Sequence, residues 1–279
     1  KASNGLQISA DAQSWKTILE KADLETAGTA YNVLINQLPA DNLEPVSTTG
    51  NVAAGKMDMF YGVAAANDDD GGNFYISSTK ETDVTGTTGK YIAFDLFLKV
   101  DQDTTVYLSS NSKVTINGDT DLGLQNAARV AFVTEGSLTA DKDPGDMRAL
   151  ALATGTADIW EPNYDTHTAK GVAAARDTYG VTTTTTNGAK IPYFGIKDII
   201  PVNTVPMKQS TTANPNETYF DSVTTKWNTA AANSTNFEFG RLTAGVTKIR
   251  VYMWVEGQDV DCENSASGAT INFDLQFTT

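Results

Sequence analysis

The sequence predicts a mainly β protein, a jelly-roll-type β-sandwich with short helices and long loop insertions. Segments that alternate apolar and polar residues recur from the first residues to the last, as in strands with one buried face. Turn sequences rich in Gly, Asn, Asp and Ser separate these segments, and helical periodicity is short and rare. No repeat or linker divides the 279 residues, so we expect a single domain over residues 13–279, preceded by a terminal strand over residues 1–12.

The first half of the chain contains most of the predicted elements. Residues 5–12 alternate as a strand does, and apolar residues three and four positions apart predict a short helix over residues 14–22. Residues 68–73 have the composition of a tight turn and lead into a strand at residues 74–77. The same alternation predicts strands at residues 91–100, 105–108, 113–116 and 127–134.

The middle of the chain is predicted to be an irregular insertion over about residues 164–236. Four prolines punctuate residues 192–215, which disfavours regular sheet structure there. Residues 182–186 are an unbroken run of Thr, and β-branched Thr favours an edge strand or an exposed ribbon.

The end of the chain alternates strongly over residues 247–256 and again over residues 271–277. A short loop separates the two segments, so we expect a terminal β-hairpin. The side chains predicted to be buried in it are Val251, Met253, Phe273 and Leu275.

Charge and composition exclude several classes of partner. The net charge of -14 and the pI near 4.4 leave no basic stripe for nucleic acid. No apolar run of about 18 residues is present, so we expect no membrane span. The single cysteine, Cys262, permits no intrachain disulfide and is expected to be a small buried apolar group. The chain begins at Lys1 without Met, which a removed signal peptide or a chain cut elsewhere would each explain.

Catalytic patterns are missing from the sequence, and we expect no enzyme. His167 is the sole histidine, so a nucleophile–histidine pair would have to use it, and its polar neighbours predict an exposed loop. Two histidines four apart, a phosphate-binding loop and a dinucleotide fingerprint are all lacking. Paired carboxylates could hydrolyse glycosides, but nothing in the sequence selects a pair.

Calcium is the one cofactor that the residues suggest. Asp68, Asp69, Asp70 and Asn73 offer hard oxygen ligands in a loop that contains glycine. Similar acid clusters occur at residues 141–146 and 259–263, and none matches the twelve-residue helical calcium loop. Ordinary turn chemistry accounts for the same residues, so structural Ca²⁺ and plain turns both stay open.

Several stretches together resemble one protein family. They are residues 91–99, 105–109, 123–133, 159–163 and 251–262. These stretches resemble exported surface proteins of Gram-positive bacteria related to the TasA and camelysin fibre subunits. The resemblance implies a jelly-roll domain, secretion with signal-peptide removal, and assembly into extracellular fibres of the biofilm matrix. It also implies that a terminal strand of one subunit completes the sheet of the next. Camelysin has been described as a protease, but one histidine cannot supply a metal-binding pair, and residues 164–236 lie outside the resemblance.

A self-assembling extracellular filament subunit is therefore the leading hypothesis. The polymerisation strand would carry Gly5, Leu6, Ile8, Ala10 and Ala12, and would add to an open sheet edge of a neighbouring copy, head to tail. The partners expected are the chain itself and other matrix or cell-surface components. The same strand could equally pair within its own domain, as amino-terminal strands usually do.

Two other classes remain as alternatives. A viral capsid or surface-layer jelly roll would use the same fold in a closed shell or a planar lattice. A carbohydrate-binding adhesive module would need an exposed aromatic platform. The candidates for that platform are Trp160, Tyr164, Tyr219 and Trp227.

Overall fold

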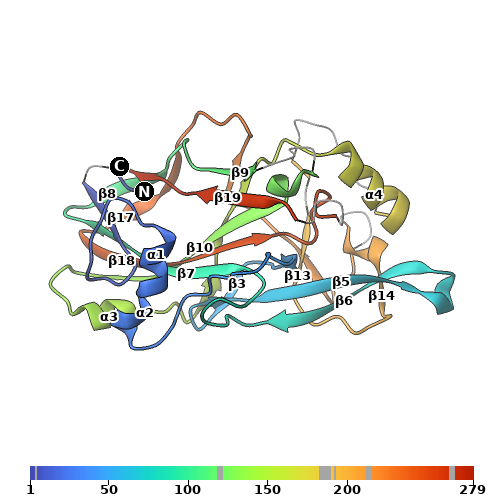
Figure 1. Ribbon diagram of the computed structural model, residues 1–279, viewed down its shortest axis with the longest axis horizontal. Helices are drawn as coiled ribbons and strands as arrows, with labels where there is room; N and C mark the ends of the chain where they lie inside the picture. The colour runs from blue at the N-terminus through green and yellow to red at the C-terminus, as the bar shows by residue number, and fades with distance from the viewer. Residues whose placement is uncertain (4, 118–121, 182–189, 192, 212–214, 264–267) are drawn as a thin grey trace.

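The computed structural model describes residues 1–279 except residues 4, 118–121, 182–189, 192, 212–214 and 264–267 (Figure 1). The described part is mostly β, with two layers of strands packed face to face and a long hairpin at one end. The predicted all-β class is confirmed. The Thr run at residues 182–186 lies outside the described residues.

One layer is a six-stranded sheet in the order β1-β7-β18-β10-β12-β16. All neighbours in it are antiparallel except the parallel pair β12 and β16. The strands are β1 (Leu6–Ser9), β7 (Ile92–Val100), β18 (Gly245–Val255), β10 (Ala128–Leu138), β12 (Asp158–Pro162) and β16 (Trp227–Thr229). The strongly alternating segments of the sequence thus form the centre of this sheet.

The facing layer is smaller and is built from two short sheets, β17-β8-β20 and β9-β19. The chain runs from β8 into β9 and from β19 into β20, so the two sheets form one bent layer. Its strands are β17 (Phe237–Leu242), β8 (Thr104–Leu108), β9 (Lys113–Asn117), β19 (Thr270–Asp274) and β20 (Phe277–Thr278).

A hairpin of two nine-residue strands, β5 (Met59–Asn67) and β6 (Asn73–Glu81), extends at the end of the molecule opposite α1 (Figure 1). The turn predicted at residues 68–73 joins them. The remaining short strands are β2 (Val46–Ser47), β3 (Asn51–Ala53), β4 (Lys56–Met57), β11 (Thr154–Thr156), β13 (Phe194–Ile196), β14 (Val205–Pro206) and β15 (Phe220–Ser222).

The α-helices of the described chain are α1 (Lys21–Thr26), α2 (Gly28–Tyr31), α3 (Pro144–Arg148) and α4 (Ala169–Tyr179). The helix predicted at residues 14–22 is wrong in position. Lys16 instead exchanges two backbone hydrogen bonds with Ile8, and helix α1 begins only after Glu20, which forms a capping box with Asp23. No helix of the described residues is both long and apolar enough to cross a membrane.

The predicted terminal hairpin is also wrong. Strand β18 lies between β7 and β10 in the six-stranded sheet, whereas β19 and β20 belong to the facing layer. Val251 and Met253 are buried as expected, but Phe273 and Leu275 are only partly buried. The two segments face each other across the core instead of pairing edge to edge.

The main core fills the space between the two layers. Phe132 of β10 makes edge-to-face contacts with Trp227, Phe239 and Phe277, which come from three different strands. A second cluster on the other face of the sheet surrounds Tyr252 and Trp254. The predicted insertion supplies β16 to the sheet and shares a third cluster with Phe60 and Ile76 of the hairpin.

Candidate assembly site: a terminal strand beside an open apolar groove

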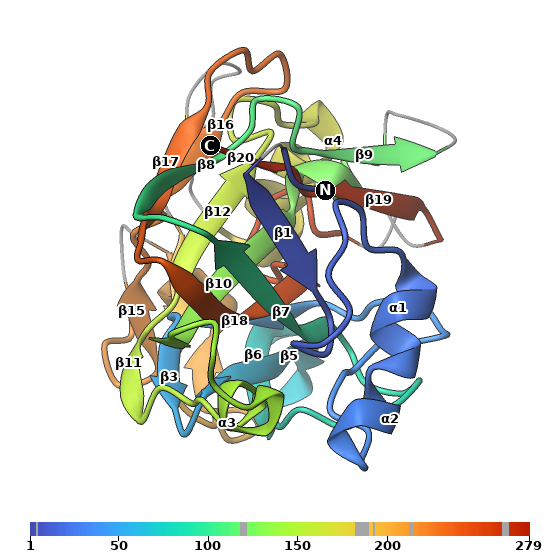
Figure 2. The same ribbon diagram turned by 90° about the vertical axis from the view of Figure 1, so that its left-hand side faces the viewer.

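The amino-terminal strand pairs with β7 of its own chain (Figure 2). Leu6 lies opposite Val100 and Ile8 opposite Leu98, and both β1 side chains are buried. Ala10 and Ala12 are buried as well, whereas Gly5 is exposed. In the single chain this strand therefore pairs within its own domain, the alternative left open above, and its pairing between copies stays a prediction.

A return segment holds β1 from its outer side. The carboxylate of Asp11 accepts hydrogen bonds from the backbone N–H groups of Gln13 and Ser14, which reverses the chain after β1. Lys16 then pairs with Ile8, and the N–H of Ala2 donates to the carbonyl of Thr17 at 2.7 Å. Residues 1–17 thus form a unit with its own internal hydrogen bonds.

The first residues also border the facing layer. Ala2 forms a parallel bridge with Phe277 of β20, and the Lys1 amino group donates to the carbonyl of Leu275 at 2.9 Å. Beyond this point, β19 pairs with β9 on one side only, and the described residues place no strand against its other edge. The facing layer therefore ends in an unpaired edge next to the amino terminus.

An apolar groove of about 700 Å³ opens beside this edge. Its floor is the inner face of the six-stranded sheet, with Phe94 and Leu96 of β7 and Met253 of β18. Phe273 and Leu275 form one wall and Ile8 of β1 lies on the other. The partial exposure of Phe273 and Leu275 follows from the groove, because no side chain of the described chain covers them from that side.

The segment that contains α1 and α2 packs loosely over the groove. Neither helix has a buried residue, although Leu24 lines both this groove and a second cavity of about 230 Å³ beneath the same segment. Ile18, Val33 and Leu34 are more than half exposed, at 52%, 62% and 57%. Apolar surface therefore extends from the groove onto the outside of the molecule.

The acidic loop predicted to bind calcium forms the tip of the hairpin. Asp68, Asp69 and Asp70 form a 3₁₀ turn, and Asn73 and Tyr75 donate hydrogen bonds to the Asp70 carboxylate. Asn67 accepts from the N–H of Asp69 and so caps the turn. Among the described residues no three His, Cys, Asp or Glu side chains converge as metal ligands, and calcium binding stays a prediction for a chelation experiment.

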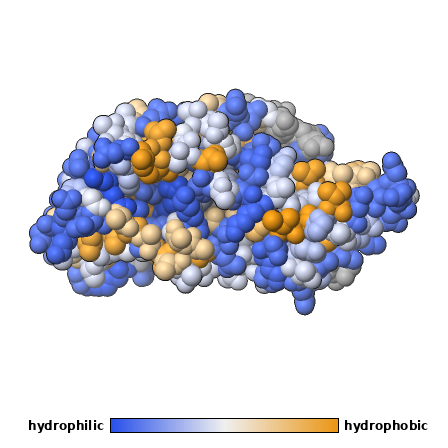
Figure 3. Space-filling model, turned by 90° about the horizontal axis from the view of Figure 1, so that it is seen from below, coloured by the Kyte–Doolittle hydropathy of each residue, from blue (hydrophilic) through white to orange (hydrophobic). Residues whose placement is uncertain are grey.

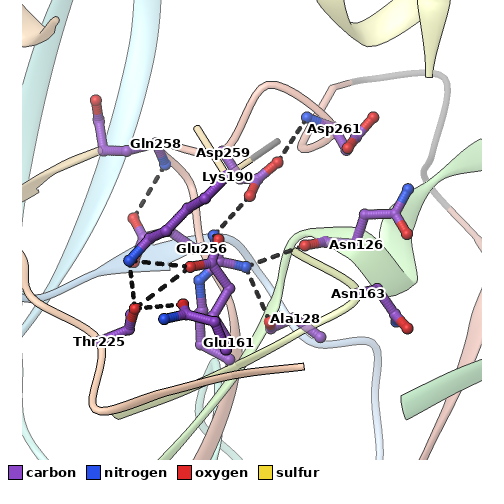
Figure 4. A network of polar contacts seen from close by, with 12 residues as sticks. Asn126, Ala128, Glu161, Asn163, Lys190, Thr225, Glu256, Gln258, Asp259 and Asp261 are labelled. Carbon is purple, nitrogen blue, oxygen red and sulfur yellow. Dashed lines mark hydrogen bonds and ion pairs between the residues drawn. The ribbon is translucent and has the colours of Figure 1, made fainter. Parts of the chain in front are cut away.

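A buried polar network surrounds Arg129, close to the start of β10 and the end of β18 (Figure 4). The Arg129 guanidinium pairs with Glu161 at 2.9 Å and Asp259 at 2.7 Å, and also donates to two backbone carbonyls. Burial raises the pKa of the neighbouring Glu256 to about 7, and Trp254 donates its indole N–H to that carboxyl. The network joins β10, β12 and the chain after β18, which suits a structural clamp.

Two residues that could carry chemistry belong to the same region. The His167 ring is buried and lies 3.3 Å from the Asp261 carboxylate, so the predicted surface location is wrong. Asp261 also accepts hydrogen bonds from the N–H and hydroxyl of Thr168, whose hydroxyl caps α4. Burial raises the pKa of the Cys262 thiol, which disfavours the reactive thiolate.

The aromatic platform proposed for carbohydrate binding does not form from its tryptophans. Trp160 and Trp227 are buried and lie in neighbouring strands of the six-stranded sheet. The Trp160 indole donates to Thr229, and the Trp227 ring stacks on Phe239. Both tryptophans are thus core residues, and an adhesive surface would have to be built from other side chains.

Comparison with known proteins gives no relative: no family model, no curated protein and no solved structure matches this chain. The fold defines it as a mostly-β sandwich protein.

Proposed function

We propose that this chain is the structural subunit of an extracellular filament that forms by exchange of the amino-terminal strand between copies. The observation that carries the proposal is the open apolar groove beside an unpaired strand edge, next to a terminal strand. An exposed groove of this kind is an aggregation hazard unless a strand or another subunit fills it. In the exchange proposed here, the groove is the place where the strand of a neighbouring copy enters before it replaces the resident β1.

The geometry suits exchange of residues 1–17 as one unit. Their internal hydrogen bonds, from Ile8 to Lys16 and from Ala2 to Thr17, can be kept when the unit moves. In the neighbouring copy, Leu6 and Ile8 would meet the same β7 residues that they contact in their own chain, so little contact energy is lost. The groove next to Ile8 gives an incoming strand room to enter before the resident strand leaves.

Repeated exchange of this kind gives an open polymer. Each copy donates its own strand to one neighbour and accepts a strand from another, and such a head-to-tail contact does not close unless the rotation between copies closes a ring. A jelly-roll topology, secretion after signal-peptide cleavage and a place in the biofilm matrix rest on the resemblance to the TasA and camelysin fibre subunits. A closed capsid shell or a surface-layer lattice would use the same fold without strand exchange.

A disulfide that locks β1 in its own chain tests the proposal. Gln7 and Lys99 lie directly opposite each other in the β1–β7 ladder, and facing residues of antiparallel strands are about 4.5–5.5 Å apart at Cα, within disulfide range. The variant carries Gln7→Cys and Lys99→Cys, together with Cys262→Ala to remove the native thiol. Filament formation is followed by light scattering and negative-stain electron microscopy.

The oxidised variant is expected to stay unpolymerised, and the same protein after reduction is expected to form filaments. Reduced and oxidised samples have identical sequences, so each is the control for the other. Filaments that grow equally well from the oxidised protein would rule out exchange of β1. Failure of the unmodified chain to form filaments at any concentration would remove the filament proposal altogether.

A further inference from the structure

The outer half of β5 is a second unpaired strand edge, far from the groove. Strand β6 pairs with all of β5, from Met59 opposite Glu81 to Asn67 opposite Asn73. On its other side, β5 pairs only through Tyr61 and Phe60, with β2. From Val63 to Asn67 the described residues place no strand against this edge, and Val63 and the three alanines that follow it are exposed.

This edge lacks the protection that edge strands usually carry. Charged side chains, proline or a bulge normally prevent pairing with another chain, but residues 63–66 are Val followed by three Ala. The opposite edge of the same hairpin, formed by β6, is covered by other parts of the chain. There β14 pairs with Ile76 and Tyr75 and presents Pro206, and the Tyr179 ring of α4 packs edge-on against Phe74 at 5.0 Å.

Exposed apolar side chains gather at the same end of the molecule. Val63 is 42% exposed, and Ile199 and Val202, on the segment beside the other edge of β6, are 52% and 72% exposed. In Figure 3, orange atoms lie over the half of the molecule that contains β5, β6 and β14, and others lie over the opposite half. Val63 and the alanines that follow it therefore make the unpaired edge itself apolar and exposed, as expected for a protein contact.

We propose that this edge binds the same edge of a second copy, with the two β5 strands antiparallel. Antiparallel pairing of identical strands about a two-fold axis is self-complementary, so one surface serves both copies. The unpaired segment runs over five residues from Val63 to Asn67, and its midpoint is Ala65. The pairing thus places Ala65 opposite Ala65, and the small side chains allow the two backbones to approach.

The charge at the hairpin tip favours antiparallel over parallel pairing of the two β5 strands. Asp68, Asp69 and Asp70 follow the unpaired segment directly and are exposed. In the antiparallel pair the two Asp68 residues are six positions apart, about 20 Å at about 3.4 Å per residue. That separation exceeds the screening length of about 8 Å at physiological salt, so the tips do not repel each other. Parallel pairing in register would place the two acidic triplets side by side.

The contact does not depend on strand exchange at the groove, because it uses the opposite end of the molecule (Figure 1). It links two subunits isologously, so in a filament it would join neighbouring filaments side by side. A weak contact repeated along two polymers gains strength through multivalency.

A charge-exchange experiment tests the pairing. It is done in the oxidised Gln7→Cys, Lys99→Cys, Cys262→Ala protein, in which strand donation cannot produce dimers. In this background Ala65→Lys and Ala65→Glu each place like charges directly opposite in the dimer, which destabilises a strand pair. Ala65→Ser is the neutral control. Sedimentation velocity over a range of concentrations gives the dimer dissociation constant, and circular dichroism checks that each variant is folded.

The parent and Ala65→Ser proteins are expected to dimerise. Each charged variant alone is expected to dimerise about fivefold or more weakly, and an equimolar mixture of the two charged variants is expected to regain the parent affinity. A parent protein that is monomeric at every concentration would overturn the proposal. So would charged variants that dimerise as the parent does, or a mixture that shows no recovery.

Discussion

Leu6 of β1 lies directly opposite Val100 of β7, and both side chains are buried in the core that the two layers share. The terminal strand is therefore part of the fold of the single chain. Leu6→Ala is expected to lower the free energy of unfolding by about 2–4 kcal/mol, because the buried isopropyl group of Leu6 is lost and a cavity remains.

Denaturant melts under conditions in which the protein is monomeric measure this loss. Gln7→Ala is the matched control, since Gln7 is the exposed neighbour in the same strand and its truncation should leave the melt unchanged. A Leu6→Ala protein as stable as the parent would mean that β1 is not packed against β7 in solution.

The groove predicts that a Phe→Ala substitution lowers the stability of the monomer less at Phe273 than at Phe132. Phe132 is buried at the centre of the core, whereas Phe273 forms a wall of the groove and is only partly buried. Phe132→Ala is expected to cost about 3–5 kcal/mol of monomer stability, and Phe273→Ala clearly less. Filament formation should also respond to Phe273→Ala, because an incoming strand would enter beside that ring before it replaces the resident β1. Equal losses in the monomer melts would show that the groove is filled in solution.

The buried Arg129 network predicts a strong effect of removing the guanidinium at its centre. Arg129→Met leaves the Asp259 carboxylate buried without its cationic partner and leaves Glu161 with Lys190 alone, at 3.6 Å, which costs about 3–5 kcal/mol. Arg176→Met is the control, because Arg176 and its partner Asp177 are exposed and the pair should contribute nothing measurable. Thermal melts of both variants at neutral pH make the comparison, and similar melting temperatures would contradict the clamp role.

The stability of the protein is expected to rise as the pH falls from about 8 to about 5. Burial raises the pKa of Glu135 to about 7 from an ordinary value of 4.5, and Glu256 changes in the same direction. Between those values the folded chain holds protons that the unfolded chain has released, so acidification favours folding. Asp11 and Asp23, whose pKa values are lowered, act in the opposite sense only in more acidic solution, below about pH 4.

Glu135→Gln tests the origin of this dependence. The amide oxygen can still accept the hydrogen bond from the N–H of Leu152, but the side chain no longer titrates. Its melting temperature should therefore vary less between pH 5 and pH 8 than that of the parent. The exposed Glu217→Gln serves as control, and an unchanged pH dependence in the Glu135 variant would exclude this carboxyl as a cause.

The sequence predicts the central strands well because their side chains alternate, which assigns each residue to one of the two faces of the sheet. Strands β7, β10 and β18 were expected at nearly their observed positions. Strand β5 could not be predicted in the same way, since its outer half is mostly alanine. That half is extended because β6 pairs with it, a contact that sequence periodicity does not record.

The failures arise where tertiary contacts override local signals. The apolar spacing of Trp15 and Ile18 suggests a helix, but the Asp11 turn directs this segment back along β1 as an extended strand partner. The two last alternating segments look like a hairpin because they are neighbours in sequence, yet the chain crosses between layers after β18. The groove was not predictable, since its lining comes from segments as far apart as Ile8 and Phe277, which are separated by 269 positions.

The first and last residues of the chain lie close together in the fold (Figure 1). The N–H of Phe277 donates to the carbonyl of Lys1, and the N–H of Thr279 donates to the Ser3 hydroxyl. A short linker could therefore join the ends while new termini are opened in a distant surface loop, without disturbing either layer. In such a circular permutant β1 is tethered at both ends. If copies exchange β1 as proposed, the permutant would keep its architecture but would lack the chain end that lets a strand pass from one molecule to the next, so folding and polymerisation could be measured separately.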